Sequence, residues 1–221
     1  MIKAVLWDID STLLKTGGAG AVAWQRAFRE LWEVDADITE HTREGMTDPE
    51  IAEIVFREVI GRDGSDEERA AAIAGYLSHL QEAVDESEGY ELMPGIEEIL
   101  PRLAEEGVLL GIVTGNIEAA AHIKLGRGGL NRYFAFGGYG SDARDRTELT
   151  KKGVERGEEV AGHPLDPKAT IGVGDTPRDV AACHGAGIRV VGVATGRYSV
   201  EELRREGADW AIADVTAGFP V

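Results

Sequence analysis

Four aspartates stand where short apolar runs end. Asp8 and Asp10 follow the first run, in the stretch AVLWDIDST, and Asp175 and Asp179 belong to the later stretch GDTPRD. Asp8 and Asp10 point the same way because they are two residues apart in extended chain. Carboxylates gathered in one cleft repel one another unless a cation or protons intervene, and a set of oxygen ligands favours a hard cation. The four aspartates therefore predict a Mg²⁺ site.

The same residue types could transfer a phosphoryl group. An aspartate carboxylate can attack phosphorus and form an aspartyl phosphate, while a second one donates a proton to the leaving oxygen and later takes one from water. Thr114 in the stretch VTGN, with backbone N–H groups of the Gly-containing loops, could bind the phosphoryl oxygens. A local alternative stays open, since Thr176, Pro177 and Asp179 also suit the start of a helix.

Repeating apolar runs predict the elements that must position these residues. Five short runs, largely apolar and rich in Val and Ile, are typical of strands in a covered parallel sheet: 3–9, 108–114, 169–174, 188–194 and 209–214. Five helical segments alternate with the later runs: 95–107, 117–129, 147–162, 177–187 and 200–207. This order predicts an α/β fold with a doubly wound, mainly parallel sheet. Ligands of such sheets bind beyond the carboxyl ends of the strands, where the aspartates and Thr114 stand.

The stretch from about residue 15 to residue 90 interrupts this order. It has no convincing strand and predicts three helices, at 19–32, 48–61 and 66–86. A helical insert after the first strand would form a lid. We therefore expect an α/β core domain of residues 1–14 and 91–221 and a small all-helical cap domain of residues 15–90.

Taken together, these motifs resemble the haloacid dehalogenase superfamily. Its phosphatases carry DxDxT, then a Thr or Ser after the second strand, a basic residue and GDxxxD, which stand here as DIDST, VTGN and GDTPRD. The stretches LLKTGGAGAVAWQRAF, GMTDPEI and VVGVATGRYSVEELRREGADWAIAD resemble the phosphoglycolate phosphatase-like branch with a helical cap. The likeness covers nearly the whole chain and implies a Rossmann-like core.

The resemblance implies a role for each motif residue. Asp8 would be nucleophile and metal ligand, and Asp10 general acid/base with its backbone carbonyl on Mg²⁺. Thr114 would bind the phosphoryl group, Asp175 would hold the metal, and Asp179 would support it. Further substrate contacts are expected from Ser11, Gly115, Asn116, Arg43 and Thr47. The acid at position 10 argues for phosphate-ester hydrolysis, because dehalogenases and phosphonate-cleaving members lack one there.

The chain departs from the family pattern in its basic residue. The family usually has a Lys-Pro pair just before the helix that leads to GDxxxD, and this chain has none there; Arg144, Arg146, Lys151 and Lys152 are the candidates. Only the start of that helix lies near the phosphate, so Arg146 is preferred and Lys151 comes second. In the cap, Arg43 and Thr47 could face the leaving group, and Thr47 fits equally well as the cap of a helix that starts at Asp48 or Pro49.

The composition of the chain indicates which classes of binding partner and which cellular compartment to expect. The net charge of −17 over 221 residues disfavours nucleic acid, and no apolar run approaches the length that spans a membrane. With one cysteine no internal disulfide can form, which suits the cytoplasm. We expect a phosphatase of small phosphorylated metabolites, such as phosphoglycolate or sugar phosphates, acting as monomer or homodimer. A phosphomutase of β-phosphoglucomutase type, a receiver-like regulator and an inactive scaffold are the alternatives.

Overall fold

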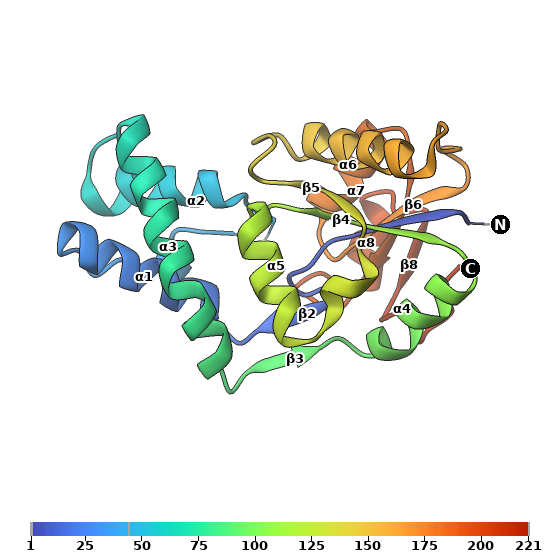
Figure 1. Ribbon diagram of the computed structural model, residues 1–221, viewed down its shortest axis with the longest axis horizontal. Coiled ribbons are helices and arrows are strands. Elements are labelled where there is room, and N and C mark those ends of the chain that lie inside the picture. The colour runs from blue at the N-terminus through green and yellow to red at the C-terminus, as the bar shows by residue number, and fades with distance from the viewer. Residues whose placement is uncertain (1, 44, 221) are drawn as a thin grey trace.

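A six-stranded parallel sheet forms the centre of the protein (Figure 1). The computed structural model describes residues 2–43 and 45–220. The strands run in the order β5-β4-β1-β6-β7-β8, so that the first strand of the chain lies inside the sheet. Their bounds are Ala4–Trp7 (β1), Leu109–Thr114 (β4), Phe136–Tyr139 (β5), Thr170–Gly174 (β6), Arg189–Val193 (β7) and Trp210–Ile212 (β8).

Helices cover both faces of this sheet. They are α4 (Ile96–Glu105), α5 (Glu118–Arg127), α6 (Arg146–Ala161), α7 (Pro177–Gly185) and α8 (Val200–Arg205). Alternate residues of β1 point to opposite faces: Trp7 packs in the cluster that includes α4 and α5, whereas Leu6 packs in the cluster of α6, α7 and α8. The doubly wound α/β fold predicted from the sequence is confirmed.

The inserted segment packs around a second hydrophobic cluster, which also includes Ile117 and Ala120 at the start of α5. Its helices are α1 (Ala19–Trp32), α2 (Asp48–Ile54) and α3 (Asp66–Glu86), with a 3₁₀ turn at Ile38–Glu40. Trp24 stacks on Tyr76 with ring centroids 4.4 Å apart, and Phe28 packs edge-on against Phe56. The expected helices 19–32 and 66–86 are found with those bounds. The expected helix 48–61 is found in two parts, the α-helix α2 and a π-helix at Val55–Ile60 that follows it directly.

Two short strands connect the insert to the core. β2 (Leu14–Thr16) and β3 (Tyr90–Leu92) pair antiparallel and lie side by side at the neck in Figure 1. The expected boundaries at 14/15 and 90/91 fall within this ladder, and the division into two domains stays a prediction. In the described part of the chain, every helix is too short or too polar to cross a membrane.

β5 is a strand that the sequence pattern did not predict. Its sequence FGGY places Gly137 and Gly138 in the middle, and glycine is depleted in strands. A Cβ on Gly138 would overlap the backbone of Leu149 on α6. Gly138 is required because α6 packs directly onto the strand backbone, whereas a Cβ on Gly137 would overlap the ring of Tyr139. The contact between α6 and the strand joins distant segments, so the local sequence pattern does not reveal it.

Candidate active site

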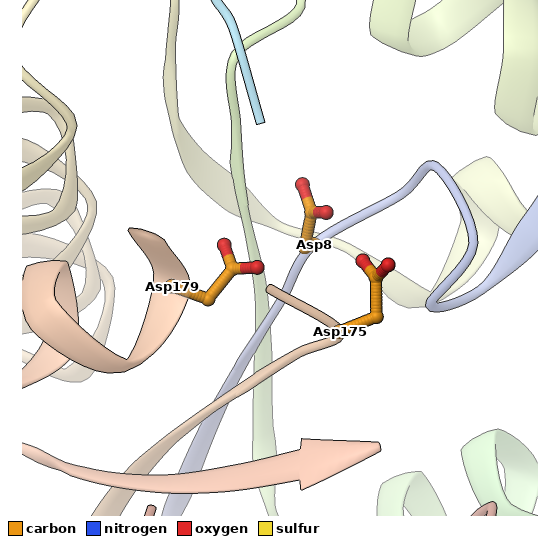
Figure 2. Close-up of side chains that lie close together, drawn as sticks. All are labelled: Asp8, Asp175 and Asp179. Carbon is orange, nitrogen blue, oxygen red and sulfur yellow. The ribbon is translucent and has the colours of Figure 1, made fainter. Parts of the chain in front are cut away.

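Three buried carboxylates meet at the carboxyl edge of the sheet (Figure 2). Asp8 follows β1, Asp175 follows β6, and Asp179 lies in the first turn of α7; one oxygen of each lies within 4.8 Å of the others. β1 and β6 pair with Trp7 opposite Val173, and this register sets Asp8 beside Asp175. Figure 2 shows the three side chains turned toward a common point. Such a donor set, all oxygen and converging, fits a hard divalent cation.

Arg146 completes this cluster from the start of α6. Its Nη2 lies 2.9 Å from Oδ1 of Asp8 and 2.5 Å from Oδ1 of Asp179, and its Nε also donates to Asp179. The side chain is only 9% exposed. Asp145 caps α6 and fixes where the helix begins. The structure thus places the preferred basic candidate against the expected nucleophile.

Asp179 is occupied on both of its oxygens. Oδ1 accepts from Arg146, and Oδ2 accepts from the N–H and hydroxyl of Thr176 at 3.0 and 2.7 Å. Thr176 in turn caps α7, as the local interpretation of GDTPRD expected. Asp179 therefore orients Arg146 and the start of α7. This arrangement fits the expected role of Asp179 as a residue that supports the metal site without binding the metal itself.

The surroundings of Asp8, the expected nucleophile, disfavour the ionised form of its carboxyl group. Burial raises the pKa of Asp8 to about 7, although the Arg146 guanidinium lowers it, and the carboxylates of Asp179 and Asp10 raise it further. One guanidinium does not balance three carboxylates. A divalent cation at this point would supply the positive charge that keeps Asp8 ionised.

Asp10 lies apart from the three carboxylates and has a partner that sequence reasoning missed. Lys124 Nζ contacts its two oxygens at 2.9 and 2.7 Å, and Nδ2 of Asn116 donates to it at 2.8 Å. Burial alone would raise the pKa of Asp10, but the Lys124 ammonium and these hydrogen bonds hold it below its ordinary value.

A signal for Lys124 exists in the sequence. On α5 the buried residues are Ala120, Ala121, Lys124 and Leu125, so the lysine lies on the apolar face of its helix. A single Lys among small apolar residues at helical spacing indicates a buried, paired charge. With alanines as neighbours, however, the apolar face is hard to recognise.

A cavity of about 520 Å³ lies between these groups and the insert. The expected residues Ser11, Thr114, Gly115, Asn116 and Arg43 line it. Further lining residues come from the insert, among them Trp24, Ile38, Met46, Ile51 and Tyr76.

Besides Asp179, which lies behind Arg146, two expected site residues do not line this cavity. Thr47 is buried, and its hydroxyl accepts from the N–H of Glu50 in a capping box that starts α2. Lys151 points to the surface, half exposed, and pairs with Glu148. Thr47 caps α2 and makes no contact with the cavity, because its side chain is buried away from it. Lys151 lies beyond the first turn of α6 and outside the cavity, so the geometry favours Arg146 as the basic residue.

Asp48 joins the insert to the loop after β4. Its N–H donates to the carbonyl of Gly115 at 2.9 Å, and its Oδ2 accepts from the N–H of Ile117 at 2.8 Å. Burial raises the pKa of Asp48 to about 6, against the opposing charge of Lys124. These two bonds fasten the cavity wall of the insert to the loop that follows Thr114.

Comparison with known proteins agrees with this geometry. Residues 5–193 match the model of a family described as haloacid dehalogenase-like hydrolase. The chain is 29% identical to a phosphoglycolate phosphatase of Rhodospirillum rubrum (100% of this chain, 92% of the relative) and 27% identical to a glyceraldehyde 3-phosphate phosphatase of Methanopyrus kandleri (93% and 90%). The crystal structure of β-phosphoglucomutase from Clostridium difficile superposes with a TM-score of 0.74 at 20% identity, covering 100% of this chain and 93% of that one.

Proposed function

The chain belongs to the haloacid dehalogenase-like hydrolase family, and we propose that it hydrolyses phosphate monoesters of small metabolites with Mg²⁺ through an aspartyl phosphate on Asp8. The family and the phosphatases among its relatives support the enzyme class, phosphoric monoester hydrolase. The metal, the intermediate and the substrate class are inferred from the site.

One observation carries this proposal. Asp8, Asp175 and Asp179 lie together beside the cavity, with a buried arginine between two of them. Asp8 and Asp175 would hold the cation and Asp179 would support the site from nearby; the cation when bound would neutralise phosphoryl oxygens and keep Asp8 ionised. Arg146 would stabilise the charge on the phosphoryl group from the other side.

Each remaining group suits one step of a two-step transfer. Asp8 attacks phosphorus and the ester bond breaks, while Asp10, which Lys124 keeps ionised in the free protein and which takes up a proton before this step, gives that proton to the leaving oxygen. Asp10 then takes a proton from the water that hydrolyses the aspartyl phosphate. Thr114 is suited to bind a phosphoryl oxygen. Its Oγ1 accepts from the N–H and side-chain amide of Asn116, so its own proton can be donated into the cavity.

The cavity favours a small substrate. Its volume of about 520 Å³ lies within the range that accommodates small metabolites. The insert supplies mainly apolar walls, such as Trp24 and Ile51, and the guanidinium of Arg43 at an exposed position. Phosphoglycolate-like compounds and sugar phosphates, which combine one phosphate with a short polar body, suit these dimensions.

Phosphate release tests the proposal. A panel of phosphorylated metabolites is incubated with wild-type protein and with Asp8→Asn, each in Mg²⁺ and in EDTA. Release that requires Mg²⁺ and is lost in Asp8→Asn supports the proposal, and the best substrate names the class. Interconversion of sugar phosphates with little free phosphate would identify a phosphomutase instead, and no turnover at all an inactive scaffold.

A further inference from the structure

Lys124 is a buried cation that none of the motifs above includes. Its side chain is only 7% exposed, and it projects from α5 into the wall of the cavity. The backbone at this position is fixed as well, because the hydroxyl of Tyr90 on β3 donates to the Lys124 carbonyl at 2.8 Å. Burying an ammonium group is costly unless it is paired with an opposite charge, so the function of Lys124 is to be sought in its partner.

That partner is the carboxylate of Asp10, held at three points. Lys124 contacts both oxygens, and Asn116 adds a bond to Oδ2. The carboxylate is not part of the three-aspartate cluster, yet 46% of its side chain stays exposed, because it faces the cavity. The ion pair therefore turns Asp10 away from the cluster and leaves one side of the carboxylate open to a bound molecule.

We propose that Lys124 is the positioning residue for Asp10, holding its carboxylate beside the oxygen of the leaving group and apart from the metal-binding carboxylates. This rests on the proposed phosphatase function. Without Lys124, the Asp10 side chain could rotate toward the cation site, since only the bond from Asn116 would oppose it. Proton transfer needs the donor within hydrogen-bond reach of the leaving oxygen, so a rotated Asp10 would fail in that step alone.

The effect of the leaving group on the rate distinguishes a residue that positions Asp10 from one that binds the phosphoryl group. A phenolate such as p-nitrophenolate leaves without a proton, whereas an alkoxide needs one. A residue that acts through Asp10 therefore matters for alkyl phosphates and little for p-nitrophenyl phosphate. A residue that binds the phosphoryl group would matter equally for both, because both transfer the same group.

The experiment compares kcat and KM of wild type and Lys124→Met on p-nitrophenyl phosphate and on the best alkyl phosphate of the panel. Met keeps the length and flexibility of the side chain without its charge. We expect kcat for the alkyl ester to fall by about 10²- to 10³-fold, and for the aryl ester by less than about 10-fold, with little change in KM. Asp10→Asn should show the same pattern, and the double variant should lose no more than Asp10→Asn alone.

Controls keep the result interpretable. Lys168→Met removes an exposed lysine outside the cavity and should change the kinetics on neither substrate. If Lys124→Met does not fold, Lys124→Gln retains a donor for Asp10 and should show the same preference for the aryl ester at smaller amplitude. An equal loss on both esters, a loss confined to KM, or failure of both variants to fold would overturn the proposal. Absence of turnover by the wild type would instead overturn the phosphatase function itself.

Discussion

Arg146 and Asp8 form an ion pair in which the guanidinium Nη2 lies 2.9 Å from the carboxylate Oδ1, and each side chain is only 9% exposed. The pair links the start of α6 to the end of β1. It places a cation at the first position of α6, where we propose that Arg146 takes the place of the lysine of the family pattern. An arginine is always charged and offers several donors, so it can hold Asp8 and Asp179 at once.

Removing this guanidinium should harm both activity and stability. In Arg146→Ala the buried carboxylates lose their cation, and we expect kcat to fall by about 10²- to 10³-fold and the free energy of unfolding to fall by about 3–5 kcal/mol. Arg146→Lys should lie between, since it keeps the charge without the two-sided contact. Steady-state kinetics and urea denaturation measure both effects. Lys151→Ala is the matched control, and full activity in Arg146→Ala with loss in Lys151→Ala would reverse our assignment.

Magnesium should stabilise the folded protein as well as activate it. A ligand that binds only the native state adds about 2.7 kcal/mol at a concentration of one hundred times its dissociation constant. We expect Mg²⁺ to raise the melting temperature, EDTA to abolish both the rise and the activity, and Asp175→Asn to abolish the rise. Asp85→Asn, which removes an exposed carboxylate on α3, should behave like wild type. An equal rise in Asp175→Asn would contradict the metal site.

Stability should depend on pH through Asp48. Burial raises its pKa from 3.8 to about 6, so the folded state holds this proton more tightly than the unfolded state between these values. The free energy of unfolding contributed by Asp48 should therefore decrease as pH rises from about 4 to about 6, by on the order of 3 kcal/mol in all.

The variant Asp48→Asn isolates this effect. It cannot titrate, and its amide oxygen can still accept from the N–H of Ile117. Urea denaturation of both proteins between pH 3.5 and 7.5 gives their free energies of unfolding. The free energy of unfolding of the variant should increase relative to that of wild type as pH rises from about 4 to about 6. A difference that is constant with pH would disprove the assigned shift.

Close backbone contact between the insert and the core should matter for closure of the cavity. A Cβ on Gly115 would overlap the carbonyl of Met46. Gly115→Ala should therefore push this part of the insert away, admit water and lower kcat/KM by at least about 10-fold, as expected for a misplaced lid. Gly126→Ala on α5 is the control, because its Cβ would meet only the Asn131 amide nitrogen at 3.5 Å. Equal kinetics in the two variants would show that this contact is dispensable.

Much of the fold was predictable because each element carries its own local signal. The apolar runs before Asp8 and Asp175 are buried strands, and α1 and α3 begin and end where their amphipathic segments do. β5 was not predicted because its two glycines have low strand propensity; Gly138 is required by the close packing of α6 and Gly137 by the side chain of Tyr139.

The sequence by itself determined five of the six strands of the main sheet, the helices between them, the acids at the strand ends and the family, since these depend on residue type and spacing along the chain. Only the tertiary structure decided which charges meet. It places Arg146 against Asp8 and leaves Lys151 at the surface. It makes Thr47 the cap of α2. It brings Lys124 into contact with Asp10, 114 residues away in the chain. A lysine on a helix is usually solvated. Its partner depends on which helix face the sheet and the insert cover, and on how closely distant segments pack.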